Sequence, residues 1–212
     1  MELWHPPHLY YMAALEPNAA IIANIGILSH NSVSAVPNLQ PVVRSIADPS
    51  VNRRRATRML NGRVVHDYVP LYWAHHTPMQ FVILRDNVIA KEDLVFVVCD
   101  SHKVAAISGV LSSDGNAASS ESTFYEGLGA ITQIDWAIIS SPNAFSKKYK
   151  WQKCAEVLVP DRLPQSCITY LAVVSEGAKA RLSLAINATQ QTLRIPAGTQ
   201  QPPPIKVQPS LY

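Results

Sequence analysis

The sequence feature that most restricts the fold is an uninterrupted apolar run at residues 94–99, Leu-Val-Phe-Val-Val-Cys. The run has the length of a strand and no polar alternation, which is typical of a strand buried on both faces. Such a strand needs neighbouring strands and a covering layer on each side of the sheet. With 212 residues, the chain is long enough for one large domain with a core of this kind.

Weaker patterns predict the rest of the sheet and several helices. Apolar segments bounded by turn residues predict strands at 9–13, 69–73, 79–84, 155–159 and 168–174. Helix start and stop signals predict helices near 17–26, 52–58 and 176–186, and 128–139 is a short helix or a mixed segment. Polar stretches at 29–52 and 112–123 predict loops. The predicted class is α+β with a mixed or antiparallel central sheet.

The prolines divide the chain into two parts. Residues 1–195 carry the patterns above and predict a single domain. Residues 196–212 contain Pro202-Pro203-Pro204 and Pro209, and proline cannot continue a helix or the interior of a sheet. We therefore expect 196–212 to form an extended, mobile C-terminal tail.

The charge distribution excludes nucleic-acid binding by bulk charge. The 18 Lys and Arg residues nearly balance the 15 Asp and Glu residues, for a net charge of +3. A polyanionic partner must therefore be held by a local cluster of cations. The segments 53–58 and 147–153 contain four cations each, eight of the 18, so we expect a nucleic acid to bind near them.

Several other classes of protein and site are not supported by the sequence. The three cysteines have no close pairing, which argues against a disulfide framework and against a cysteine zinc site. His75-His76 has no nearby carboxylate at metal-ligand spacing, so we expect no metal. No signal peptide and no apolar run of about 18 residues is present, which predicts a cytoplasmic protein without membrane association. Walker, Rossmann and nucleophile-elbow motifs are absent.

Two groups of charged residues are candidates for chemistry. Glu156 begins an apolar strand, and the pattern alone favours a solvent-facing position on an edge strand over a catalytic carboxylate. The run Arg53-Arg54-Arg55-Ala56-Thr57-Arg58 is either a solvated basic helix or a helix from which one arginine grips a diphosphate. Asp100-Ser101-His102 follows the buried strand at its carboxyl end, where functional side chains often gather, although it fits an ordinary turn equally well.

Together, several segments resemble the DarT family, toxin ADP-ribosyltransferases that modify bases of single-stranded DNA. The resemblance covers residues from about 9 to about 175, and two of its blocks are specific in combination. In chain order, the segments that carry it are Gly26-Ile27-Leu28-Ser29-His30-Asn31, Ser45-Ile46-Ala47, the arginine run, His66-Asp67-Tyr68-Val69-Pro70-Leu71-Tyr72-Trp73, Thr77-Pro78-Met79, Asp100-Ser101-His102, Asp135-Trp136 and Gln152-Lys153-Cys154-Ala155-Glu156-Val157-Leu158-Val159.

The resemblance implies a fold, an activity and partners. The fold is an ADP-ribosyltransferase-like split mixed or antiparallel sheet with peripheral helices. NAD is the co-substrate, no metal takes part, and the ADP-ribosyl group passes to a base in single-stranded DNA. The protein would be a monomeric toxin, with a macrodomain-type antitoxin as its partner.

The resemblance also implies roles for individual residues. Glu156 matches the family's catalytic glutamate, and Arg55 matches an arginine that contacts NAD and takes part in catalysis, with Arg54 as the alternative register. Two further groups match positions at the NAD pocket and at the nucleic acid. The NAD positions are Tyr11, Ala13, Asn18 and Tyr72, and the nucleic-acid positions are His102, Lys147, Lys148 and Lys150.

Two departures from the family pattern leave the acceptor open. Tyr11-Met12-Ala13 replaces the usual His-x-Thr, which removes a threonine hydroxyl at Ala13. His75-His76-Thr77-Pro78-Met79 replaces the Pro-Arg-x-Pro-Met loop. The modified base is thymine or guanine, and RNA or protein is an alternative acceptor. A second alternative, from another class, is a non-catalytic nucleic-acid-binding module that uses the two basic segments.

Overall fold

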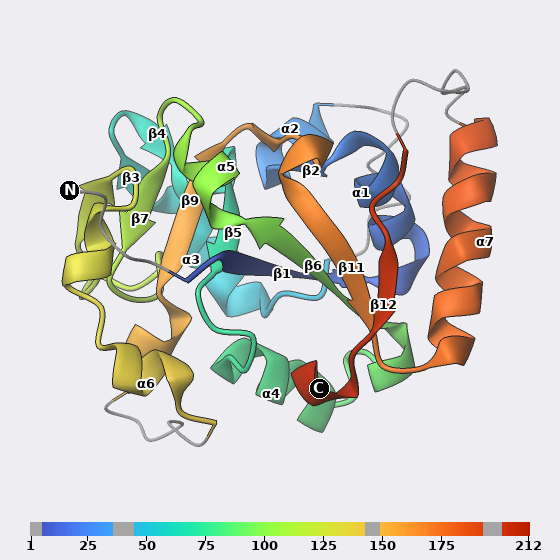
Figure 1. Ribbon diagram of the computed structural model, residues 1–212. Helices are drawn as coiled ribbons and strands as arrows, with labels where there is room; N and C mark the ends of the chain where they lie inside the picture. Colours follow the sequence, from blue (N-terminus) through green and yellow to red (C-terminus); the bar gives the residue numbers. More distant parts are fainter. Residues whose placement is uncertain (1–5, 36–44, 143–148, 193–200) are drawn as a thin grey trace.

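The computed structural model describes residues 6–35, 45–142, 149–192 and 201–212. Within them, one eight-stranded sheet runs through the centre of the molecule (Figure 1). Its strand order is β12-β11-β6-β1-β5-β9-β7-β8, and every pair is antiparallel except β11 with β12. The strands are β1 (His8–Ala14), β5 (Tyr68–Tyr72), β6 (Leu94–Asp100), β7 (Leu111–Ser113), β8 (Phe124–Glu126), β9 (Glu156–Pro160), β11 (Ile168–Val173) and β12 (Ile205–Val207).

Among the described residues, two short ribbons and seven α-helices surround this sheet. The ribbons are β2 (Ile27–Leu28) with β10 (Arg162–Leu163), and β3 (Met59–Leu60) with β4 (Arg63–Val64). The helices are α1 (Ala20–Ile25), α2 (His30–Ser34), α3 (Pro49–Thr57), α4 (Pro78–Arg85), α5 (Ser101–Ala105), α6 (Trp136–Ser140) and α7 (Glu176–Thr192). A π-type turn spans Leu15–Ala19, and single 3-10 turns span Val65–Asp67, Lys91–Asp93, Gly129–Thr132, Gln152–Cys154, Gln165–Cys167 and Pro209–Leu211.

The apolar run predicted to be a doubly covered strand is β6, and the prediction is confirmed. All six residues from Leu94 to Cys99 are fully buried. Val95, Val97 and Cys99 belong to a core cluster that includes residues of α1 and α7, which lie together on one side of the sheet (Figure 1). Phe96 and its neighbours on the other face pack into a second cluster that includes α4. Because successive side chains of a strand point to opposite faces, this single apolar segment contributes side chains to both core clusters.

The sheet is split where β1 meets β5. β1 forms seven residue pairs with β6, and β5 forms five with β9, but β1 and β5 pair only through Tyr10 and Tyr72. The two halves of the sheet therefore diverge on either side of this single pair. This arrangement confirms the predicted α+β class with a split, largely antiparallel sheet.

Three predictions about secondary structure are wrong. The predicted loop 29–52 contains α2 and the start of α3, while its residues 36–44 lie outside the described residues. Residues 79–84 form helix α4 instead of a strand, because Thr77 caps its first turn by accepting a hydrogen bond from the Gln80 N–H at 3.2 Å, and Pro78 occupies the first helical position. The strand prediction for 79–84 rests on a short apolar segment of strand length. The predicted loop 112–123 contains the end of strand β7, and 128–139 divides into a 3-10 turn and α6, which Asp135 caps.

The expectation of an extended, mobile tail over 196–212 is wrong for residues 201–212, whereas 196–200 lie outside the described residues. Strand β12 is the edge strand of the sheet and pairs in parallel with β11. No strand pairs with the outer side of β12 among the described residues, so the prolines that flank it interrupt no hydrogen bonds there. Leu211 is buried in the second core cluster. The Tyr212 hydroxyl hydrogen-bonds with the carbonyl oxygens of Leu94 and Ala172, both at 2.8 Å. The end of the chain is thus part of the fold.

Candidate active site

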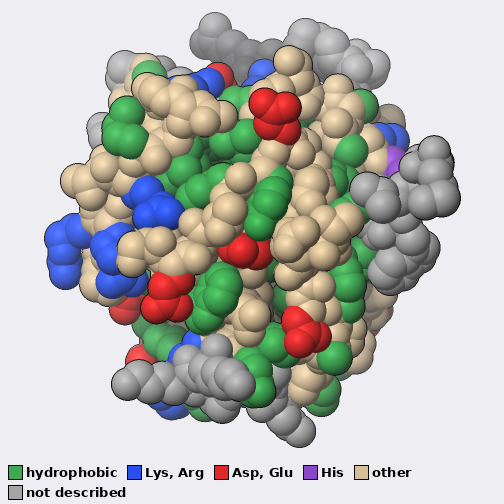
Figure 2. Space-filling view, turned by 90° about the vertical axis from the view of Figure 1, so that its left-hand side faces the viewer, with side chains coloured by type: hydrophobic (Ala, Val, Ile, Leu, Met, Phe, Trp, Pro, Cys, Tyr) green, Lys and Arg blue, Asp and Glu red, His purple; other side chains and the backbone are tan. Residues whose placement is uncertain are grey.

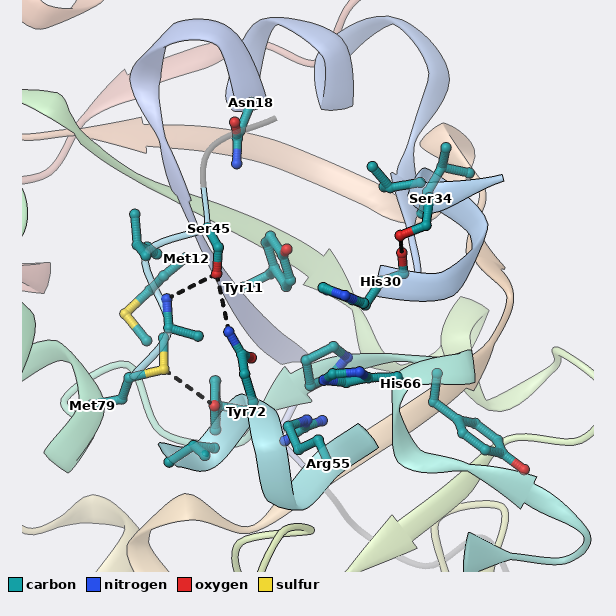
Figure 3. Close-up of a pocket in the computed structure, with 18 residues that line it drawn as sticks. Tyr11, Met12, Asn18, His30, Ser34, Ser45, Arg55, His66, Tyr72 and Met79 are labelled. Atoms are coloured by element: carbon teal, nitrogen blue, oxygen red, sulfur yellow. Dashed lines mark hydrogen bonds between the residues drawn. The ribbon is translucent and has the colours of Figure 1, made fainter. Parts of the chain in front are cut away.

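A cavity of about 290 Å³ lies where β1 and β5 diverge (Figure 3). Tyr11 and Met12 of β1 form one wall, and Pro70 and Tyr72 of β5 form another. Because the strands separate at this point, side chains from both can face the same space. The remaining lining residues come mainly from α1–α3 and the segments around them, and they include Asn18, His30, Ser45, Asn52, Arg55, His66 and Met79.

Helix α3 brings one arginine of the basic run into this cavity. Asp48 caps the helix by accepting hydrogen bonds from the N–H groups of Ser50 (2.7 Å) and Val51 (3.2 Å). Arg55 is buried, whereas Arg53 and Arg54 are exposed. The position of the capped start and the helical repeat therefore turn Arg55 into the cavity and leave Arg53 and Arg54 exposed.

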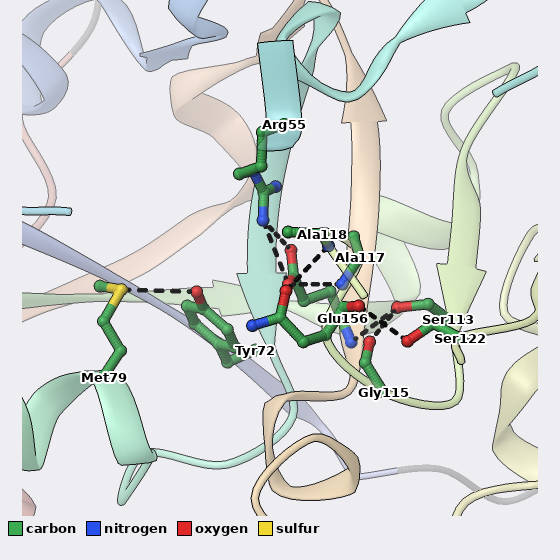
Figure 4. A network of polar contacts seen from close by, with 10 residues as sticks. Arg55, Tyr72, Met79, Ser113, Gly115, Ala117, Ala118, Ser122 and Glu156 are labelled. Carbon is green, nitrogen blue, oxygen red and sulfur yellow. Dashed lines mark hydrogen bonds and ion pairs between the residues drawn. The ribbon is translucent and has the colours of Figure 1, made fainter. Parts of the chain in front are cut away.

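Arg55 forms an ion pair with Glu156 at the floor of the site (Figure 4). Arg55 Nη1 lies 2.9 Å from Glu156 Oε2 and 3.2 Å from Oε1. Glu156 Oε1 also accepts a hydrogen bond from the backbone N–H of Ala117 at 3.0 Å. Glu156 has no exposed surface and is paired with Tyr72 in register. The solvent-facing edge position that the pattern favoured is wrong, since β9 lies between β5 and β7.

The loop after β7 closes over Glu156 because it packs against the segment that precedes β9. The backbone N–H of Asn116 donates to the carbonyl oxygen of Trp151 at 2.8 Å. Gly115 lies directly against the Trp151 ring, where an added Cβ would come within 1.8 Å of a ring atom. Only glycine fits at this contact, so the position of the Ala117 N–H on the carboxylate depends on the close approach of these two segments.

The electrostatics of the site keep Arg55 charged and the tyrosines neutral. Burial alone lowers the pKa of Arg55, but Glu156 and the neighbouring tyrosines outweigh burial, and the pKa is raised above its usual value. Burial, followed by the adjacent charge of Glu156, raises the pKa of Tyr72 well above its usual value. Its hydroxyl donates to Met79 Sδ at 3.6 Å. Tyr72 can therefore donate a hydrogen bond but does not ionise near neutral pH.

Two nitrogens at the cavity have no hydrogen-bond partner among the described residues. They are Arg55 Nη2 and His66 Nε2, both buried. The His66 ring stacks on His30, with ring centroids 4.2 Å apart and planes at 27° (Figure 3). A buried guanidinium nitrogen without a partner is costly unless a ligand completes it, and an anionic oxygen is its natural partner. These residues therefore fit a ligand that carries phosphate groups and a ring.

The pKa of His66 predicts a pH-dependent stability. Burial, then the nearby His30 and Arg55, lowers this pKa to about 4, whereas the unfolded chain has a value of about 6.5. As the pH falls, the unfolded state binds the proton first, so the free energy of unfolding decreases from about pH 6.5 to about pH 4 and then levels off. In urea titrations across this range, His66→Gln is expected to show a shallower decrease. Part of the slope will remain, because burial also lowers the pKa of His75 to about 4. An unchanged slope would contradict the assignment.

The other predicted site residues do not all meet at this cavity. Tyr11, Asn18 and Tyr72 line it, as the resemblance implies, but Ala13 belongs to the core beneath. His102 is exposed on α5 and is not among the lining residues. Lys150 is exposed, and Lys147 and Lys148 lie outside the described residues. Their role at a nucleic acid stays a prediction.

Lys153, which was counted among the cations near the nucleic acid, has a structural position. It is 1% exposed, and its ammonium group donates to the carbonyl oxygens of Ile138 (3.1 Å), Ile139 (2.8 Å) and Ser141 at the end of α6. Figure 2 shows one face of the molecule, on which basic side chains gather at the left of the view while acidic ones are scattered. Because Arg55 and Lys153 are both buried, fewer of the eight cations can contact a nucleic acid than the sequence predicts.

We expect Lys153→Met to lower the free energy of unfolding by about 2 kcal/mol, because it leaves three carbonyl groups at the end of α6 without their donor. Denaturant unfolding measures this change. Lys179→Met is the control, since Lys179 forms only an exposed pair with Glu176 and its loss should cost no more than about 0.5 kcal/mol. Equal losses in the two variants would contradict the structural role of Lys153.

Sequence reasoning overlooked His30 and His66 as members of the site. Both lie inside segments of the resemblance, but nothing in their local pattern distinguishes them from other histidines. Their approach depends on how α2 contacts the turn at Val65–Asp67.

Among the described residues, no group of three or more His, Cys, Asp or Glu residues is arranged to hold a metal. No described helix is long and apolar enough to cross a membrane.

Comparisons with known proteins identify a family whose model matches this chain and relatives with similar sequences. The family model described as "ssDNA thymidine ADP-ribosyltransferase, DarT" matches residues 10–212. A DNA ADP-ribosyl transferase of Thermus sp. (strain 2.9) is 28% identical over 180 residues, with 81% of this chain and 83% of the relative covered. A DNA ADP-ribosyl transferase–DNA ADP-ribosyl glycohydrolase fusion protein of Thermosipho africanus is 27% identical, with 84% of this chain and 45% of the relative covered.

Solved structures share the fold. Thermus sp. 2.9 DarT in complex with ADP-ribosylated single-stranded DNA superposes with a TM-score of 0.82 at 21% identity, and each chain is covered completely. The same protein in complex with NAD+ gives a TM-score of 0.77, again with complete coverage. At this identity the likeness concerns the fold, and it confirms that the split sheet described above is an ADP-ribosyltransferase fold.

Proposed function

The chain belongs to the DarT family of single-stranded-DNA thymidine ADP-ribosyltransferases, and we propose that it transfers the ADP-ribosyl group of NAD to a thymine base of single-stranded DNA. The observation that carries this proposal is the buried Arg55–Glu156 pair at the floor of a cavity that holds an unpartnered guanidinium nitrogen. The family model extends to residue 212, so it includes β12 and the buried end of the chain.

The cavity residues supply contacts suited to NAD. Arg55 Nη2 is free to donate to a diphosphate oxygen, and a guanidinium suits that task because it remains charged. His66 is neutral near pH 7, so it contributes a ring face and a hydrogen-bonding nitrogen but no charge. Tyr72 adds a neutral hydroxyl beside the carboxylate. Ala13 offers no hydroxyl, so the contacts of NAD in this chain rely on Arg55 and these rings.

The reaction breaks the glycosidic bond between the ribose and nicotinamide, which leaves with the bonding electrons. Positive charge then develops on the ribose, and the carboxylate of Glu156 is placed to stabilise it. A ring nitrogen of thymine forms the new bond to the same carbon and loses its proton. Glu156 accepts that proton as general base. Because Glu156 does not line the cavity and Arg55 does, the Arg55–Glu156 contact must open when the substrates bind.

The test is mass spectrometry of short oligonucleotides incubated with the protein and NAD. We expect an ADP-ribosyl adduct on thymine-containing single strands and none when Glu156 is replaced by alanine. RNA and protein acceptors labelled in parallel distinguish the acceptors, and adducts confined to them would overturn the DNA proposal. DNA binding without any saturable NAD binding would instead identify a non-catalytic binding module.

We propose further that the chain is the toxin of a toxin–antitoxin pair. The support is the Thermosipho relative, in which a transferase and a DNA ADP-ribosyl glycohydrolase are fused. A partner of the glycohydrolase class, such as a macrodomain, would remove the modification. Expression of the chain should arrest growth, co-expression of such a glycohydrolase should restore it, and growth arrest that persists in Glu156→Ala would contradict the proposal. The monomeric state and cytoplasmic location stay predictions.

A further inference from the structure

A second cavity, of about 310 Å³, lies on the other side of the pair that joins β1 to β5. It differs from the first cavity in its lining, which is dominated by aromatic and imidazole rings. The rings come from β1, from the segment that follows β5 and from α6. They are His8, Tyr10, Trp73, His75, His76 and Trp136.

The rings are held in place by contacts with one another. Trp73 is 3% exposed and meets Trp136 edge to face, with ring centroids 5.5 Å apart. Trp136 is fixed in turn because its Nε1–H donates to the carbonyl oxygen of Ile131 at 3.1 Å. His75 lies 5.4 Å from Tyr10 and 4.2 Å from His76, by ring centroids. A preformed aromatic wall of this kind loses little freedom when a planar ring packs on it.

The charge of this cavity suits a phosphodiester strand. Its lining among the described residues includes Lys153, whose buried ammonium group donates to carbonyl oxygens at the end of α6, and no Asp or Glu. Burial, followed by His76 and Lys153, lowers the pKa of His75 to about 4, so this imidazole is neutral near pH 7. A neutral imidazole presents one donor and one acceptor to the edge of an uncharged ring. The cavity therefore combines stacking surfaces, neutral hydrogen-bonding groups and a positive local field.

The second cavity adjoins the reaction site. Tyr10 in its wall pairs in register with Tyr72, which lines the first cavity. Trp73 follows Tyr72 along β5, and Lys153 precedes Glu156 by three residues. Tyr72 and Glu156 are therefore situated at the junction between a cavity suited to NAD and one lined by rings.

We propose that the second cavity holds a nucleobase next to the modified base in the DNA strand, stacked on the rings around His75. The inference rests on the proposed function, because a strand whose thymine reaches the carboxylate must place its neighbouring nucleotides close by. Base–aromatic stacking is largely independent of sequence, and phosphates that follow the base are attracted by the local positive charge. The subsite would fix the strand at the site and set which nucleotides beside the target contribute to turnover.

The test is a scan with oligonucleotides that carry one thymine and one abasic residue, moved through each flanking position. With the unaltered protein, we expect an abasic residue at one flanking position to lower kcat/KM by about tenfold, within the range for loss of a single base–aromatic stack. His75→Ala should lower kcat/KM for the intact oligonucleotide, and the abasic residue should then cost much less. Phe81→Ala is the control, since Phe81 is 49% exposed on α4 and lines neither cavity; it should retain the full abasic penalty.

A full abasic penalty in His75→Ala, or no penalty at any position, would overturn the subsite. In both cases transfer to the intact oligonucleotide would still report the proposed function, so the two failures are distinguishable. A measurement that needs no variant uses 5-iodouracil at the flanking positions and light-induced cross-linking. Cross-links are expected on the peptides that contain residues 73–76 or 136, and cross-links confined to other peptides would contradict the proposal.

Discussion

Glu156→Gln is expected to lower kcat for ADP-ribosyl transfer to DNA by at least about 100-fold, the low end of the range for a lost general base. The amide is nearly the same size as the carboxylate, and its oxygen can still accept from Arg55 Nη1 and from the Ala117 N–H. What it loses is the negative charge and the ability to take a proton. The effect should therefore fall on kcat, with less change in the affinity for NAD.

Steady-state transfer at saturating NAD measures this change, and calorimetric titration with NAD separates binding from turnover. Glu126→Gln serves as the matched control, because Glu126 is exposed at the end of β8 and its replacement changes the net charge equally. Retention of more than about a tenth of the wild-type kcat in Glu156→Gln would remove this carboxylate from the proposed mechanism.

Arg55→Met is expected to lower the free energy of unfolding by about 3–5 kcal/mol, the cost of breaking a buried ion pair by removing one partner. Among the described residues, the substitution leaves the fully buried Glu156 carboxylate with the Ala117 N–H as its one remaining hydrogen-bond donor. It also removes the nitrogen available to a diphosphate, so NAD binding should be lost. Arg54→Met is the control, since Arg54 is exposed on the same helix and its change should cost no more than about 0.5 kcal/mol.

A double variant distinguishes loss of the pair from damage to α3. Adding Glu156→Gln to Arg55→Met removes the unpaired charge, so the double variant should be more stable than Arg55→Met alone. Urea or guanidinium unfolding of the four proteins completes the cycle. Additive losses from the two substitutions would show that Arg55 and Glu156 do not interact in the folded protein.

Local patterns predicted the parts of this fold that depend on local physics. The run at 94–99 needs burial on both faces whatever surrounds it, and β6 has that position. The Asp48-Pro49 start predicted α3, because a capped first turn depends only on residues within a few positions. Thr77-Pro78 begins α4 in the same way, but the apolar run 79–84 predicts a strand. Short apolar runs do not distinguish strand from helix.

The C-terminal segment and Glu156 show where local patterns are insufficient. Whether a proline-rich segment is mobile depends on whether a sheet edge is available to it, and β11 provides that edge for β12. Whether Glu156 faces solvent depends on which strands flank β9, and neither β5 nor β7 is adjacent to it in the sequence. Strand order follows from packing of the whole chain, so a ten-residue pattern contains no information about it.

The amino-acid sequence alone predicted a doubly covered strand and an α+β class, both of which the structure confirms. Through its resemblance to a family it also predicted Glu156 and the arginine run as the groups with chemistry, and these roles stay predictions. The tertiary structure decided which arginine enters the cavity, because Arg55 turns inward from α3 and contacts a carboxylate 101 residues away. It also shows that Lys153, which the sequence placed among the cations near a nucleic acid, is buried in the fold. His30 and His66 line the cavity. Propensity and periodicity act over a few residues, whereas a site arises from contacts between distant segments.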